Sequence, residues 1–300
     1  MYKSYNIGRM TLNEVVAICT NHIVLQELRG SGIRVLVGVA DQDIQRLANS
    51  YSAAQDWVQK NTRSYWPDVH FRYIDVGNEV IPEDYAQYVL PAAIQNLHNA
   101  LSIGGLWHHI KVSTSVETSV MDVSYPPSAG IFAMNTMNFM VPIARYLSSI
   151  GAPLLANVYP YFSYIGDPIN ISLAYALCTS TSVVVRDGNL RYINLFDAIV
   201  DALHASLEKA GAPQVPVVVS ESGWPSDGDA GVASIHNAQV YNTNLIKHVL
   251  SNGGTPKRPG NPIDTCIFNM FNEDLKGGAA VERHWGLFYR NKSLAYCLPH

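Results

Sequence analysis

Charged side chains are scarce in this sequence. Asp, Glu, Lys and Arg make up 15% of its 300 residues, whereas about 25% is usual for a soluble domain. The formal net charge is −4, so the chain lacks the basic excess with which proteins bind nucleic acid or anionic membranes. Apolar residues make up 48%, which argues against long disordered segments and for a large core.

Cysteines and long apolar runs are also few. The cysteines are too few and too scattered for a disulfide framework. None forms a C-x-x-C pair, which excludes a zinc ribbon and a thioredoxin-type site. His108 and His109 are adjacent but lack an evident third ligand, so we expect no metal and no cofactor. No apolar run approaches the roughly 20 residues of a membrane helix. The first residues contain no signal-peptide core, so the chain is either cytosolic or given without its leader. The four cysteines are Cys19, Cys178, Cys266 and Cys297.

Short apolar runs rich in β-branched residues recur along the whole chain. Polar and apolar residues do not alternate within them, which is typical of strands buried on both faces of a parallel sheet. Such strands are predicted at Ile7–Leu12, Val35–Val39, Tyr73–Val76, Ile110–Val116, Leu154–Tyr159, Pro216–Ser220 and Cys266–Phe271.

Segments with helical periodicity separate these runs. Strand and helix alternate without a linker, which indicates one α/β domain over residues 1–300. The length favours a (β/α)8 barrel over a doubly wound sheet, and the glycine-rich nucleotide motifs of open sheets are missing. Only seven strand runs are present, one fewer than a barrel needs. The predicted helices are Ile44–Gln59, Tyr85–Leu101, Asn138–Ser149, Leu195–Ala210 and Ile235–Leu250.

Carboxylates follow three of the predicted strands. Glu79 ends the run from Tyr73, Glu221 ends the run from Val217, and Glu273 follows the last strand. A single strand-end glutamate could equally cap a helix or pair with a cation. Several on one face of a charge-poor chain favour function, because barrel enzymes place their reactive groups at the carboxyl ends of strands. Most glycoside hydrolases use two opposed carboxyl groups as catalytic residues, one protonated and one ionised. The 17 tyrosines fit sugar-binding platforms.

Several longer motifs resemble the plant family-17 glycoside hydrolases, which comprise endo-β-1,3-glucanases and related 1,3;1,4-β-glucanases. The resemblance runs from about Ser31 to the C-terminus, so residues 31–300 are family-like and residues 1–30 diverge. The motifs are VGNE at Val76–Glu79, YPPSAG at Tyr125–Gly130, NVYPYFSY at Asn157–Tyr164, NLFDAIVD at Asn194–Asp201, VVVSESGWP at Val217–Pro225, FNEDLK at Phe271–Lys276 and WGLFY at Trp285–Tyr289.

The resemblance implies a (β/α)8 barrel and endo-hydrolysis of β-1,3-glucan by a retaining mechanism. It implies that Glu221 is the nucleophile, Glu79 the acid/base and Asn78 the partner of the sugar 2-hydroxyl. By the same resemblance, Glu273 and Lys276 support the acid. The candidate sugar-binding aromatics, each of which could instead be packing, are Tyr159, Tyr161, Phe162 and Trp224.

The N-terminal region departs from the family pattern. The family begins with a strand and helix before the strand that Ile7–Leu12 matches, so the first strand and helix of the barrel are expected to be missing. Thr11 stands where the family has arginine, and Asn13 where it has a tyrosine bordering the cleft. The stretch Asn13–Ile23 has no counterpart and could form one helix with the residues up to Arg29. Lost strands leave unpaired edges and open the cleft wall.

Alternative functions therefore stay open. A catalytically impaired glucan-binding relative would explain the divergent N-terminus, and a 1,3;1,4-β-glucanase would keep the site but change the substrate. A phosphate-binding barrel is disfavoured because the loop after Glu221 is acidic. We expect β-glucan as partner, a monomer, and no nucleic-acid partner or membrane span. The resemblance implies secretion to the cell wall or storage in vacuoles, where the N-glycosylation patterns at Asn170 and Asn291 would matter.

Overall fold

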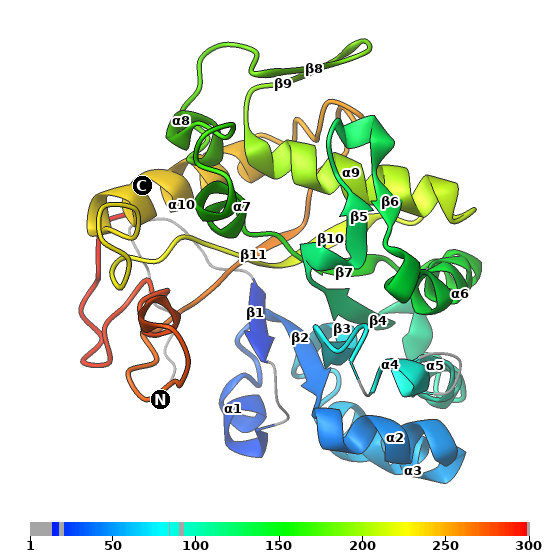
Figure 1. Cartoon of the computed structure of the whole chain (residues 1–300). Coiled ribbons are helices and arrows are strands. Elements are labelled where there is room, and N and C mark those ends of the chain that lie inside the picture. Colours follow the sequence, from blue (N-terminus) through cyan, green and yellow to red (C-terminus); the bar gives the residue numbers. More distant parts are fainter. Residues whose placement is uncertain (1–13, 18–20, 84, 90–92, 299–300) are drawn as a thin grey trace. The chain divides into compact units, whose positions relative to one another are not determined.

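A computed structural model describes residues 14–17, 21–83, 85–89 and 93–298, with only the backbone described for 14–17 (Figure 1). The predicted strand Ile7–Leu12, Thr11 and Asn13 lie outside these residues. The chain divides into two units. The first comprises residues 1–123, 131–156 and 206–218, and the second comprises 124–130, 157–205 and 219–300.

Parallel strands form the centre of the first unit. Their order is β1-β2-β3-β4-β7, and the amide of Leu154 in β7 donates to the carbonyl of Pro216, just before β10. Apolar side chains from β2, β3, β7 and β10 pack as one buried cluster, which consists of Leu36, Tyr73, Leu155 and Val218. The strands are β1 (Glu14–Ala17), β2 (Arg34–Val39), β3 (His70–Asn78), β4 (Lys111–Val116), β7 (Leu154–Asn157) and β10 (Val217–Ser222).

Strands β7 and β10 continue into the second unit. There the amide of Val158 donates to the carbonyl of Glu221 across 2.8 Å. Strand β11 (Thr265–Ile267) pairs in parallel with β10, with Val219 opposite Thr265. All six residues of β10 are buried, as expected for a strand covered on both faces. Six of the seven predicted strands, those from Val35 onward, are confirmed as β2, β3, β4, β7, β10 and β11.

The helix expected between Asn13 and Arg29 is wrong. Residues Glu14–Ala17 instead form β1, because its backbone pairs in parallel with β2. Helix α1 begins only at His22, where the Asn21 side chain accepts hydrogen bonds from two first-turn amides, and it ends at Glu27. A polar cap that satisfies otherwise unpaired amides starts a helix at a defined residue. The described chain thus opens with a β-α-β unit, drawn in blue in Figure 1.

The remaining predicted helices are present, two of them in pieces. The segment from Ile44 to Gln59 is broken at Ser50, whose extended backbone and hydroxyl cap a second helix. The long helices α6, α9 and α10 match the prediction within four residues at each end. The helices are α2 (Asp41–Asn49), α3 (Tyr51–Val58), α4 (Ala86–Tyr88), α5 (Ile94–Ser102), α6 (Met134–Ile150), α7 (Pro160–Gly166), α8 (Leu173–Ala176), α9 (Leu195–Lys209) and α10 (Ile235–Leu250).

Two short antiparallel pairs, which sequence periodicity did not reveal, complete the described structure. Strands β5 and β6 pair in the first unit, and the hairpin β8–β9 belongs to the second. No helix among the described residues is both long and apolar enough to cross a membrane. The strands are β5 (Met121–Val123), β6 (Ile131–Phe132), β8 (Val185–Asp187) and β9 (Leu190–Tyr192); the short helical turns are η1 (Gln59–Arg63), η3 (Leu106–His108), η4 (Thr118–Val120), η5 (Pro127–Ala129) and η6 (Ala280–Arg283).

Candidate active site

Glu221 lies near the carboxyl end of β10 and is 7% exposed. The hydroxyl of Tyr159 donates to Oε2 of this carboxylate across 2.7 Å. Tyr159 is the residue before α7, where Pro160 occupies the first helical position, a position at which proline costs no hydrogen bond. Strands β7 and β10 are neighbours in the sheet. Tyr159, which follows β7, can therefore donate a hydrogen bond to Glu221 in β10.

Aromatic rings surround Tyr159. The rings of Trp285 and Phe162 lie with their centroids 5.0 and 5.7 Å from it. Phe162 is 44% exposed, whereas Trp285 is buried. The exposed ring of Phe162, packed against Tyr159, offers a flat apolar surface of the kind on which sugar rings stack. Of the four predicted aromatics, Tyr159 and Phe162 therefore lie where a sugar could contact them.

Tyr161 and Trp224 are buried instead. Tyr161 is 1% exposed and donates its hydroxyl to Oδ2 of Asp229 across 2.9 Å. Trp224 is fully buried and its Nε1 donates to the carbonyl of Val232 across 3.0 Å. Both rings pack against each other with centroids 5.2 Å apart. For these two residues the structure favours packing, which the sequence had left open.

Lys276 has a nearer acidic partner than the one the sequence suggests. Its Nζ lies 3.0 Å from Glu282 Oε2 but 3.8 Å from Glu273 Oε2. Desolvation by burial opposes protonation of the amine, but the hydrogen bond and charge of Glu282, with the charges of Glu273 and Glu221, raise the pKa of Lys276 above 10.5. Lys276 therefore carries a permanent positive charge, which interacts electrostatically with the carboxylate of Glu221.

Glu79 follows β3 in the first unit, directly after Asn78, its last residue. Glu79 has φ +60°, an uncommon conformation for a residue with a side chain. Its amide donates to the carbonyl of Ser115 in β4, and the buried carboxylate of Asp75 accepts from both the amide and the hydroxyl of Ser115. Asp75 and Ser115 thus hold the backbone that carries Glu79.

Gly77 makes the turn at this strand end possible. Its φ is +83°, and a Cβ there would lie 2.6 Å from Val80 Cγ2 and 2.8 Å from Ile44 Cδ1. Both the backbone conformation and the close packing therefore require glycine. Gly77 belongs to the VGNE motif, and the sequence alone gave no reason for a glycine there.

Both predicted glutamates thus lie at carboxyl ends of parallel strands, Glu79 after β3 and Glu221 in β10. Sequence reasoning missed Asp75, Ser115 and Glu282 as partners. A buried aspartate inside an apolar strand was the available signal for the first. The rings of His108 and His109 pack against Trp107 and Trp66. The described residues hold no group of three or more potential metal ligands.

Parallel strands alternating with helices, with glutamates at strand ends, define an α/β barrel of the glycoside hydrolase class. The chain belongs to glycosyl hydrolases family 17, whose model matches residues 1–299. The match begins at the first residue and so includes residues 1–30, the region that diverges from the family's sequence motifs.

Relatives named as glucan endo-1,3-beta-glucosidases are similar over nearly the whole chain. A glucan endo-1,3-beta-glucosidase from Vitis vinifera is 49% identical over 300 residues, 99% of this chain and 84% of the relative. A basic vacuolar isoform of that enzyme from Nicotiana tabacum is 46% identical, covering 99% of this chain and 79% of the relative. The solved structure of CJP38, a beta-1,3-glucanase and pollen allergen of Cryptomeria japonica, has a TM-score of 0.91 and 46% identity, covering 96% and 90% of the two chains. The barrel fold predicted from the sequence is therefore confirmed.

Proposed function

We propose that this protein is an endo-β-1,3-glucanase that cleaves internal β-1,3-glucosidic bonds with retention of configuration. The observation that carries the proposal is the pair of strand-end glutamates in a family-17 chain. In support of it, the similar relatives bear the name glucan endo-1,3-beta-glucosidase. The family match over residues 1–299 supports one catalytic domain over residues 1–300.

In the proposed first step, the ionised carboxylate of Glu221 attacks the anomeric carbon. Glu79, protonated at that moment, gives its proton to the glycosidic oxygen, and the bond to the leaving sugar breaks. In the second step Glu79 takes a proton from water, the water oxygen attacks the anomeric carbon, and the bond to Glu221 breaks. Both glutamates return to their starting protonation states.

Other residues would support these steps. Asn78, beside the acid, would hydrogen-bond the sugar 2-hydroxyl, a contact that strengthens towards the transition state. Tyr159 would orient the Glu221 carboxylate through its hydrogen bond, and Phe162 would carry a sugar ring. Lys276, with Glu273 and Glu282 beside it, would contribute a fixed positive charge near the reacting carboxylate.

The test is hydrolysis of laminarin, a soluble β-1,3-glucan. We expect the parent to release oligosaccharides, and Glu221→Gln to be slower by at least about a thousandfold, the scale on which removal of a nucleophile acts. The control Asp227→Asn changes an exposed carboxylate in the loop after β10 and should keep the parent rate. An inactive parent would favour an impaired glucan-binding protein, and equal rates for Glu221→Gln and parent would refute the nucleophile.

The substrate, location and assembly are part of the same proposal. Cereal β-glucan with mixed 1,3;1,4 linkages should be cleaved more slowly than laminarin, and the reverse order would favour the 1,3;1,4-glucanase.

The vacuolar isoform among the relatives supports a vacuolar or extracellular location. We infer a monomer that binds β-glucan and no nucleic acid, in keeping with its low charge and net charge of −4.

A further inference from the structure

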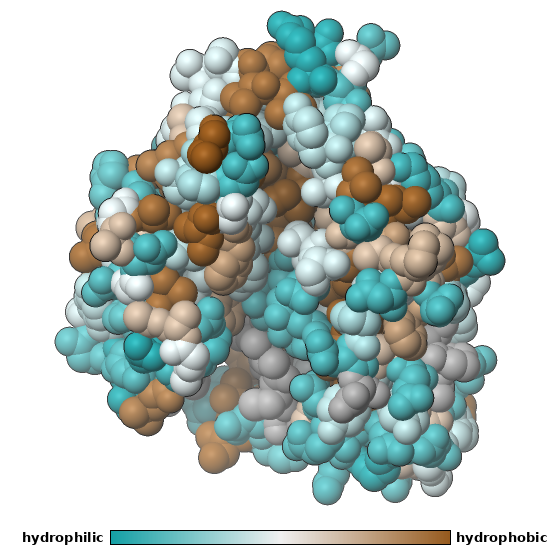
Figure 2. Space-filling view, in the orientation of Figure 1, coloured by the Kyte–Doolittle hydropathy of each residue, from teal (hydrophilic) through white to brown (hydrophobic). Residues whose placement is uncertain are grey.

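The second unit contains a cavity of about 570 Å³, within the range of roughly 300–1,000 Å³ usual for small-molecule sites. Helix α7 takes part in both this cavity and the candidate active site. Phe162 packs on Tyr159, whereas Ser163 and Asp167 line the cavity. Figure 2 shows the hollow between the regions of α7 and α9, with apolar side chains in its depth. Its apolar wall consists of Ile171, Val184, Val185, Leu195, Ala198 and Ile199.

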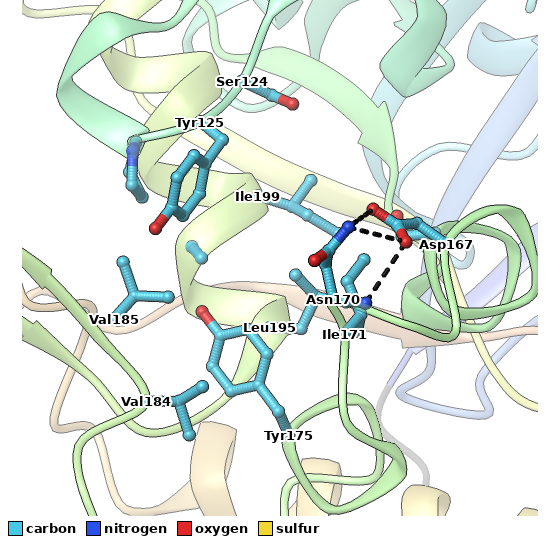
Figure 3. A pocket seen from close by; sticks show the side chains of 13 residues that line it. Ser124, Tyr125, Asp167, Asn170, Ile171, Tyr175, Val184, Val185, Leu195 and Ile199 are labelled. Carbon is cyan, nitrogen blue, oxygen red and sulfur yellow. Dashed lines mark hydrogen bonds between the residues drawn. The ribbon is translucent and has the colours of Figure 1, made fainter.

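Two tyrosines face each other across this cavity, and both hydroxyls point into the space between them in Figure 3. Tyr175 is 4% exposed, and its buried hydroxyl has no hydrogen-bond partner among the described residues. Tyr125 is 73% exposed at the mouth and makes no side-chain hydrogen bond within the described part of the chain. An unpaired buried hydroxyl costs free energy unless a ligand or a water supplies a partner.

Asn170 and Asp167 supply the polar wall opposite the tyrosines. The carboxylate of Asp167 accepts from the Asn170 amide at 3.2 Å and from its Nδ2 at 3.0 and 2.9 Å. These bonds hold the amide group so that its side-chain oxygen points toward the cavity interior in Figure 3. That oxygen accepts no hydrogen bond from any described residue. It is therefore a fixed acceptor for a ligand hydroxyl.

The lining selects an uncharged ligand with hydroxyl groups. It contains no lysine or arginine, so an anion would find no counter-charge. Asp167, its one carboxylate, already accepts several hydrogen bonds from Asn170. An aromatic ring, an aliphatic wall, tyrosine hydroxyls and the Asn170 amide oxygen together match a pyranose, which has apolar C–H faces and equatorial hydroxyls at its edge.

We propose that this cavity is an accessory binding site for a β-glucan segment, separate from the bond that is cleaved. Tyr125 carries a sugar ring at the mouth, and a sugar hydroxyl reaches Tyr175 at the inner end. The inference rests on the proposed function for the identity of the sugar, whereas the presence of a site for an uncharged hydroxylated ligand follows from the cavity alone.

The test is isothermal titration of laminaripentaose into the full chain carrying Glu221→Gln, which prevents turnover. The protein is produced without glycosylation, so that no glycan attaches to Asn170. We expect two bound oligosaccharides per chain, and one when Tyr125→Ala is added. Tyr175→Phe should weaken the accessory site by about two- to tenfold, the value of one neutral hydrogen bond. Tyr51→Ala, at another exposed tyrosine, should keep two sites.

Tyr175→Phe also distinguishes loss of binding from loss of folding. It removes a hydroxyl that has no partner among the described residues, so the melting temperature should stay unchanged or rise. The accessory site is refuted if the Glu221→Gln protein binds only one laminaripentaose per chain. It is also refuted if adding Tyr125→Ala or Tyr175→Phe leaves two sites of unchanged affinity. The proposed function fails separately. If the protein with Glu221 intact does not cleave laminarin but the Tyr125-dependent site persists, the cavity binds glucan without hydrolysis.

Discussion

The hydroxyl of Tyr159 donates a hydrogen bond to the buried carboxylate of Glu221 across 2.7 Å. This bond helps to orient the carboxylate within the site. Two residues further along, Tyr161 makes a similar bond to Asp229 across 2.9 Å. The two tyrosines are thus a matched pair in which only one contacts the proposed nucleophile.

We predict that Tyr159→Phe lowers kcat on laminarin by about ten- to a hundredfold, the value of a hydrogen bond to a charged group. KM should change much less, because the aromatic ring that borders the site is kept. Tyr161→Phe is the control and should retain kcat within about threefold, since its hydroxyl contacts Asp229 and not Glu221. Equal losses of kcat in both variants would contradict a positioning role for Tyr159.

A second prediction concerns the backbone of Glu79, whose φ of +60° is costly for any residue with a Cβ. Glycine adopts this conformation freely, so Glu79→Gly should be more stable than Glu79→Ala by about 1 kcal/mol. Urea unfolding of both variants gives the difference. At Glu117, where φ is −81°, alanine should be the more stable replacement. The same order at both positions would argue against strain at Glu79.

The ion pair between His248 and Asp197 makes stability depend on pH. The hydrogen bond from His248 Nε2 to Asp197 Oδ1, 2.7 Å long, raises the pKa of His248 above 6.5 although burial opposes this. The contribution is complete below pH 6.5, where the imidazole is charged in the folded and unfolded states. It is lost as pH rises through the raised pKa of the folded state.

We therefore predict that His248→Gln lowers the free energy of unfolding by about 1 kcal/mol at pH 5.5 and by less at pH 8.5. Thermal melts across this range measure it. His236→Gln is the control, because His236 lies on the same helix and makes no ion pair among the described residues. A constant difference between the parent and His248→Gln at all pH values would refute the charged pair.

The stereochemistry of the products tests the pairing of Glu79 with Glu221. A retaining pair requires carboxyl groups about 5–5.5 Å apart, whereas inversion needs about 6.5–9.5 Å. We predict that proton NMR during the first minutes of laminarin hydrolysis shows the β-anomer of the new reducing ends, followed by slow mutarotation. A crystal structure should show the shorter separation, and initial release of the α-anomer would rule out double displacement.

The sequence by itself determined six strands of the parallel sheet, most helices and the strand-end glutamates. These features are local, since a buried parallel strand needs a short apolar β-branched run, and the residue that ends it is read directly from the chain. The region from Asn13 to Arg29 escaped this reasoning. There the short strand β1 is stabilised by pairing with β2, and a polar cap rather than periodicity sets the start of α1.

Only the tertiary structure decided which side chains meet. The bond from Tyr159 to Glu221 joins residues 62 positions apart, because β7 and β10 are neighbours in the sheet. The choice of Glu282 as the nearer partner of Lys276, and the facing hydroxyls of Tyr125 and Tyr175, depend in the same way on side-chain direction and long-range packing. Sequence spacing fixes where a residue sits on its own element, whereas its contacts depend on how distant elements pack together.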